Sequence, residues 1–94
     1  QIYLENGDAK KALAEFTESL HRKTNLESYY QRGQVYEKLG QHDNAIADFT
    51  AGIAEAPDAP YVYRARAAAK RNTGDREGAA GDEAEADRME GKRK

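Results

Sequence analysis

The sequence repeats itself with a period of 33 to 34 residues, which constrains the possible folds more than any other feature. A glycine recurs at Gly7, Gly40 and Gly74, which are 33 and then 34 residues apart. Small and apolar residues recur after each glycine: Ala12-Leu13 with Phe16, Ala45-Ile46 with Phe49, and Ala79-Ala80. Such a period is typical of a helical unit that buries its apolar face only by stacking on its neighbours.

The residues around each glycine predict two antiparallel helices per repeat. A glycine ends a helix readily because it adopts the left-handed conformation without a steric penalty. Asp8, Asp43 and Asp75 follow the glycines and can accept hydrogen bonds from the free amides of the next helix. Pro57 ends a helix, and Pro60 suits the first turn of the next one. We therefore expect no strand, and helices near residues 1–6, 9–22, 27–39, 43–56, 60–73 and 76–89.

The segment from Leu26 to Ala59 resembles a tetratricopeptide repeat. The aromatic, small and proline positions of that family are occupied here by Tyr29, Gly33, Tyr36, Ala45, Phe49 and Pro57. Gly52 replaces the alanine that is usual at its position, and it still permits a close approach of two helices. The resemblance implies an all-α fold, namely a right-handed superhelical stack of antiparallel helix pairs, or α-α solenoid.

The resemblance continues on both sides of this repeat, so we expect one array over residues 1–90. Its parts are a partial first repeat at 1–25, a full repeat at 26–59 and a divergent terminal repeat at 60–90, followed by a basic tail at 91–94. In the terminal repeat Glu83 and Asp87 replace the apolar residues that pack on a following repeat. We therefore expect the last helix to be a solvated cap.

The aromatic residues recur at helical spacing, and we expect them to form the core between helices. This group contains Tyr3, Phe16, Tyr29, Tyr36, Phe49 and Tyr63. Phe49 is the expected main packing residue of the middle repeat. Arg32 and Arg66 share one repeat position, and we expect their stems to pack while their guanidinium groups reach water.

The resemblance also implies a function, because family members usually bind a protein or peptide on the concave face of the stack. Here helices 26–39 and 60–73 would line that face, and the expected partner-binding residues are Tyr30, Gln34, Tyr61, Arg64 and Arg71. Tyrosine and arginine are enriched at binding hot spots. An arginine grips a carboxylate at two points, so we expect a peptide with an acidic residue beside an apolar one.

Two alternatives to peptide binding remain open from the sequence. The partial first repeat leaves Leu13, Phe16 and Leu20 without part of their cover, and this surface could recruit a second copy of the chain. The array could also be an accessory domain of a larger enzyme whose active site lies outside this sequence.

Nothing in the sequence assembles a catalytic, cofactor or metal site. His21 and His42 have no second ligand at metal spacing, and the glycines are spaced as turns rather than as a phosphate-binding loop. The chain has no cysteine, which excludes disulfides and thiolate metal sites. We therefore expect a binding protein that is not an enzyme and has no cofactor.

The charge and hydropathy patterns argue against nucleic acid and membrane as partners. The formal net charge is -2, so the chain as a whole does not attract polyanions. The basic residues around Arg64 and Arg71 lie on several helix faces with acidic residues between them. No apolar run approaches the roughly 20 residues that span a bilayer. The sequence leaves the cellular compartment open.

Overall fold

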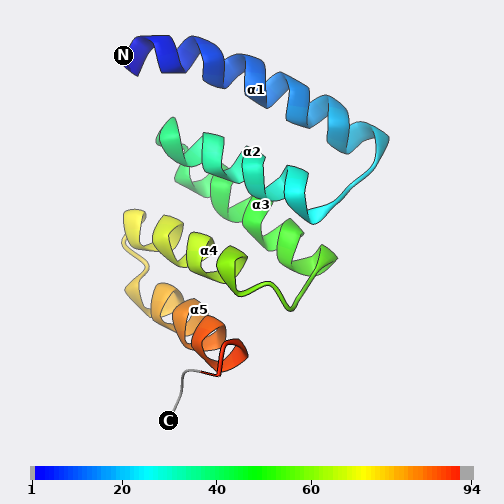
Figure 1. The fold of residues 1–94 in the computed structure, drawn as a ribbon. Helices are drawn as coiled ribbons and strands as arrows, with labels where there is room; N and C mark the ends of the chain where they lie inside the picture. Colours follow the sequence, from blue (N-terminus) through cyan, green and yellow to red (C-terminus); the bar gives the residue numbers. More distant parts are fainter. Residues whose placement is uncertain (1, 92–94) are drawn as a thin grey trace.

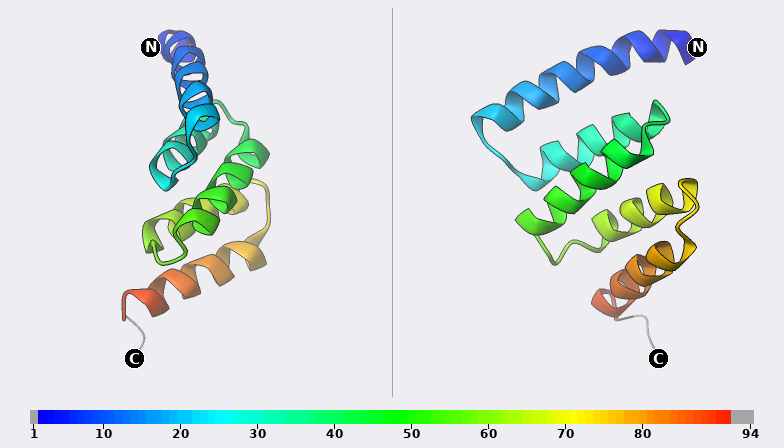
Figure 2. Two further views of the ribbon diagram at one scale, coloured as in Figure 1. Left: turned by 90° about the vertical axis from the view of Figure 1, so that its right-hand side faces the viewer. Right: turned by 180° about the vertical axis from the view of Figure 1, so that it is seen from behind.

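The computed structural model describes residues 2–91, and this part of the chain forms five helices and no strand (Figure 1). They are α1 (Ile2–Arg22), α2 (Leu26–Lys38), α3 (His42–Glu55), α4 (Pro60–Asn72) and α5 (Arg76–Met89). Each helix packs on the next one along the chain, and α2 also contacts α4. The views in Figure 2 show a zigzag of helices stacked along one axis. The predicted all-α solenoid is confirmed.

Two of the three predicted glycine turns are present. Gly40 has a φ of 78° and Gly74 a φ of 92°, in the left-handed region that disfavours other residues. After each glycine the next backbone amide donates back into the preceding helix, from Gln41 and Asp75, over 2.9 Å in both cases. Asp75 also caps α5, because its side chain accepts from the Gly78 amide. Such a turn reverses the chain in few residues, so the two helices of a repeat lie antiparallel.

The prediction of a turn at Gly7 is wrong. Gly7 lies inside α1, which is one continuous helix of 21 residues, and its φ is not positive. Elsewhere the turn is stabilised because the helix before the glycine packs along the helix after it, as α2 packs on α3. Among the described residues no helix packs on α1 from before Gly7 in the way that α2 packs on α3. Extending an existing helix then costs less than nucleating a second one.

The prediction that Asp43 caps the third helix is also wrong. This helix starts one residue earlier than expected, at His42, and its cap position is occupied by Gln41, whose side chain accepts no capping hydrogen bond. Asp43 therefore lies in the first turn of the helix, where a negative charge interacts favourably with the helix dipole.

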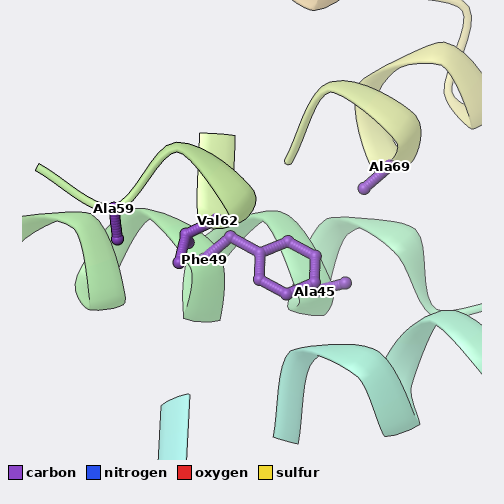
Figure 3. Packing of buried hydrophobic residues seen from close by; sticks show 5 residues of the cluster. All are labelled: Ala45, Phe49, Ala59, Val62 and Ala69. Carbon is purple, nitrogen blue, oxygen red and sulfur yellow. The ribbon is translucent and has the colours of Figure 1, made fainter. Parts of the chain in front are cut away.

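The middle of the stack is built around Phe49, whose side chain is 0% exposed. Figure 3 shows its ring beside Ala45, with Val62, Ala59 and Ala69 as the other members of the buried cluster. The predicted role of Phe49 is confirmed. A Cβ at Gly33 would lie 2.5 Å from the Phe49 ring, so only glycine fits at that point. The remaining described aromatic residues of the predicted core are half-buried: Phe16, Tyr29, Tyr36 and Tyr63.

A buried ion pair occurs twice, one repeat apart, and each copy links three consecutive helices. An arginine binds an aspartate of its own repeat and a threonine of the preceding one: Arg32 with Asp48 and Thr17, and Arg66 with Asp82 and Thr50. In both copies Nε and Nη2 donate to the carboxylate over 2.8 Å, and Nη1 donates to the hydroxyl over 3.1 Å. We call each copy a Thr–Arg–Asp set.

The two aspartates of these sets are 4% and 5% exposed, and the guanidinium groups, expected to reach water, bind these carboxylates while the arginine side chains stay 20% and 18% exposed. Burial alone would raise the pKa of Asp82. Hydrogen bonds from Arg66 and Lys70 outweigh that effect and hold the pKa below its usual value. The hydrogen bonds to the aspartates also raise the pKa of Arg32 and Arg66. The sets specify the relative position of successive helices, because any shift that separates the buried carboxylate from its arginine is strongly unfavourable.

Candidate protein-interaction surface

Three of the five predicted partner-binding residues come together on the face that α2 and α4 share. The rings of Tyr30 and Tyr61 meet edge to face, with centroids 4.9 Å apart. Tyr30 also packs on Phe49 at 5.9 Å, and the Gln34 side-chain amide donates to the Tyr30 hydroxyl over 2.8 Å. We call Tyr30, Gln34 and Tyr61 the aromatic face. Its geometry is well constrained before any partner binds.

Tyr61 is 44% exposed, the only large hydrophobic side chain with such exposure among the residues whose burial is described. Burial of part of its ring, followed by the negative charge of Glu27, raises the pKa of Tyr61 above its ordinary value. Its hydroxyl is therefore protonated at neutral pH and can donate a hydrogen bond. Glu27 in turn accepts a hydrogen bond from Gln31. The aromatic face thus combines apolar area with donors and acceptors.

The other two predicted residues, Arg64 and Arg71, are held by acidic side chains of α5. Arg64 Nη2 lies 2.9 Å from Asp87 and 2.5 Å from Glu90. Arg71 Nη1 lies 2.9 Å from Glu83. The hydrogen bonds to the two carboxylates raise the pKa of Arg64. Both guanidinium groups already have acidic partners within the chain.

The repeat positions explain why Arg64 faces α5, although they do not specify which carboxylate it binds. Arg64 occupies the same repeat position as Tyr30, and Glu83 the same position as Phe49. Since Tyr30 faces α3 and contacts Phe49, a residue at its position in the next repeat must face α5. Glu83 and Asp87, expected to be free in solvent, are therefore ion-paired and only partly exposed. Their role as a cap on a terminal repeat stays a prediction.

The polar residues beside the aromatic face also pair across helices. Glu37 of α2 lies 2.7 Å from the His42 ring nitrogen of α3, and it accepts from Asn72 of α4 over 3.0 Å. His42 is half-buried. These contacts join both repeats, so the face behaves as one surface rather than two.

Two open hollows in the described part of the chain are the most prominent, and neither resembles a catalytic pocket. One, of about 570 Å³, is lined by Pro57, Asp58, Tyr63, Glu85, Arg88 and Met89. The other, of about 280 Å³, lies between α1 and α2 and is lined by Asp8, Ala9, Ala12, Val35 and Lys38. Over the described residues, no three potential ligands cluster as a metal site. No helix in that range has the length and hydropathy to cross a bilayer.

The fold and its repeated contacts define a helical-repeat protein, and the comparisons identify the type of repeat. Residues 26–58 match the family model of the tetratricopeptide repeat, so the resemblance inferred from the sequence is confirmed. No curated protein matches the sequence.

Among solved structures, the fold is similar to that of MamA. One crystal structure of MamA gives a TM-score of 0.87 at 26% identity, over 90% of this chain and 50% of that chain. A second gives 0.84 at 26%, over 89% and 46%. A third, titled MamA MSR-1 C2, gives 0.73 at 19%, over 98% and 59%, and supports the fold alone. The chain spans about half the length of these structures.

The repeat and the MamA-like fold support a general class of function, a protein–protein interaction module built from helical repeats. Proteins of this class are generally scaffolds rather than enzymes, and their partners are other proteins. The particular surface and partner do not follow from the class.

Proposed function

We propose that the chain binds a peptide segment of a partner protein on the aromatic face of α2 and α4. The observation that carries this proposal is the exposure of Tyr61 beside Tyr30. An ordered aromatic pair offers large contact area, and its side chains have little freedom left to lose on binding. The Gln34 amide and the tyrosine hydroxyls add directional hydrogen bonds that an extended or helical peptide can satisfy.

Arg64 and Arg71 lie on α4 with Tyr61. They contribute to binding when a ligand carboxylate replaces one of their present ion-pair partners. A ligand carboxylate that approaches Arg64 replaces Asp87 or Glu90, and one that approaches Arg71 replaces Glu83. Exposed ion pairs of this kind contribute little to stability, so they exchange readily. We therefore expect apolar and hydrogen-bonding contacts with the tyrosines to supply most of the affinity. An acidic residue in the ligand adds specificity for these arginines.

The experiment is selection from a displayed peptide library, followed by titration calorimetry of the selected peptide. Tyr61→Ala should weaken binding by about 1–3 kcal/mol, as for other hot-spot tyrosines, and leave the melting temperature nearly unchanged. Arg64→Ala should weaken peptides that carry a carboxylate and spare those that lack one. Arg76→Ala, at an exposed position on α5, is the matched control and should change neither. Unaltered affinity in the Tyr61→Ala, Arg64→Ala double variant, with the fold intact, would move the site elsewhere.

Self-association was the alternative drawn from the sequence, and it concerns a different surface on α1. Leu20 is buried, which the sequence reading did not expect, whereas Leu13 and Phe16 are half-buried.

A further inference from the structure

The tyrosine pair of the aromatic face lies beside a carboxylate, that of Glu27. Glu27 is in the first turn of α2, three residues before Tyr30, so the two side chains share a face of that helix. Glu27 also matches Tyr61 after a shift of 34 residues, and the helices that carry them, α2 and α4, are in contact. Burial and then the nearby charge of Glu27 raise the pKa of Tyr61, in agreement with this position. The carboxylate therefore lies within electrostatic reach of the exposed ring.

The charge of Glu27 is not balanced by a cation, whereas the two arginines of the proposed surface are already paired. Arg64 and Arg71 each bind carboxylates of α5. Among residues 7–91, the Glu27 side chain accepts a hydrogen bond only from the neutral amide of Gln31. A ligand at Tyr61 therefore meets a negative charge that is free to pair.

The chain itself shows which group fits a tyrosine ring beside a carboxylate. The guanidinium group of Arg32 lies over the Tyr36 ring, 5.8 Å from its centroid, and donates to Asp48. The second Thr–Arg–Asp set repeats this arrangement, with the guanidinium group 5.7 Å from the centroid of the Tyr63 ring. A guanidinium group is flat, so it can stack on a ring while its N–H groups donate to a carboxylate, whereas an ammonium group has no face to stack.

The Tyr61 ring offers a comparable surface to a ligand. Its side chain is 44% exposed, and its plane lies at 87° to the ring of Tyr30. The Gln34 amide holds the Tyr30 hydroxyl, so the pair is ordered before a ligand arrives. A cation over a tyrosine ring is attracted by the π electrons, and a carboxylate beside it adds a charge-assisted hydrogen bond. The two effects together select a cation over a neutral group.

We propose that the aromatic face recognises an arginine of the bound peptide, whose guanidinium group stacks on the exposed ring of Tyr61 and donates to the carboxylate of Glu27. This inference rests on the proposed function, because it names a ligand residue for the same surface. It adds a basic residue to a ligand for which the sequence predicted only an acidic one. Both can occur in one peptide, since Arg64, which would take the acid, lies about one turn further along α4.

The test uses three capped synthetic peptides of sequence Gly-Leu-Xaa-Leu-Gly, in which Xaa is arginine, citrulline or lysine. Citrulline has the shape of arginine without its charge, and lysine has the charge without the flat group. Binding to the whole chain is followed by the amide chemical shifts of the isotope-labelled protein. The arginine peptide should bind saturably, with the largest shift changes in the first turns of α2 and α4. Its affinity should be about three- to tenfold higher than that of the other two peptides.

Two sets of variants separate the carboxylate from the ring. Glu27→Gln should abolish the preference for arginine over citrulline, because it removes the charge and keeps the shape. Tyr61→Phe should retain the preference, whereas Tyr61→Leu should reduce it, because leucine has no π electrons. Glu77→Gln is the matched control, since Glu77 is also an exposed glutamate in the first turn of its helix, α5, and it should change none of the affinities. Circular dichroism melts verify that each variant is folded.

The inference is overturned if the arginine peptide does not bind saturably, if citrulline or lysine binds as tightly, or if Glu27→Gln leaves the preference intact. Library-selected peptides that bind the aromatic face without an arginine would also overturn it, while the proposed function stands. The proposed function fails separately if selected peptides bind the chain but ignore the Tyr61→Ala, Arg64→Ala double variant. A dimer that forms without peptide and is abolished by Glu27→Gln would overturn the inference by assigning the site to a second copy.

Discussion

Replacing Phe49 with alanine tests the central packing of the stack. The side chain is completely buried, and small residues surround it, including Gly33, Ala45 and Ala69. Glycine and alanine have no side chain that could move into the space, and the neighbouring Tyr30 ring is held by Tyr61 and Gln34, so most of the cavity should persist. Phe→Ala changes in cores cost roughly 3–5 kcal/mol, and the cost rises with the volume of the residual cavity. We expect the upper half of that range.

This loss is large relative to the stability of the whole chain. At about 0.05–0.15 kcal/mol per residue, 94 residues correspond to roughly 5–14 kcal/mol. The measurement is urea unfolding followed by circular dichroism at helical wavelengths, with the free energy extrapolated to zero denaturant. An unfolded Phe49→Ala variant at zero denaturant is compatible with the lower end of the stability range.

Phe16→Ala is the matched control, because Phe16 occupies the same repeat position on the uncovered helix. Its side chain is only half-buried, so its removal leaves no closed cavity and should cost roughly 1–2 kcal/mol. A loss below about 1 kcal/mol for Phe49→Ala, or equal losses for the two variants, would refute the assigned packing of the middle repeat.

Three further predictions concern charge, backbone and the terminal face. Because its ion pairs lower the folded-state pKa of Asp82, this group stabilises the fold above its unfolded pKa of about 3.9, and the contribution is lost as pH falls through the folded value. Asp82→Asn should therefore flatten the acid limb of a stability–pH curve, and an unchanged limb would contradict the pairing. Gly7→Ala should stabilise the chain by about 0.5–1 kcal/mol, because Gly7 lies inside the helix α1. Gly74→Ala should destabilise it by about 1–2 kcal/mol, because Gly74 has a positive φ. Thermal melts in which Gly7→Ala also destabilises the chain would contradict the continuous α1. Replacing Glu83 with Phe and Asp87 with Leu should create an apolar end face and promote association, and a monomer at high concentration in sedimentation would count against the capping prediction.

The sequence by itself determined the repeat unit and its interior. The period, the left-handed glycines at Gly40 and Gly74, and the small residue Gly33 opposite Phe49 are requirements of local geometry and volume. Each depends on residues within one repeat, so a comparison of the sequence with itself was sufficient to find it. Tyr30 and Gln34 were placed on one face by similar reasoning, because residues four apart share a helix face, and their role in binding stays a prediction.

Only the tertiary structure decided how charges pair and whether a helix ends at a glycine or continues through it. Gly7 is followed by an aspartate, as Gly74 is, yet it lies inside α1, which packs only on α2 among the described residues. Arg64 was expected to face a ligand, but it binds Asp87 and Glu90, which are 23 and 26 residues away. A long charged side chain can reach partners on several helices, and which carboxylate it meets depends on the angle and spacing of the stack. Those quantities are properties of the packed array and are absent from any single repeat.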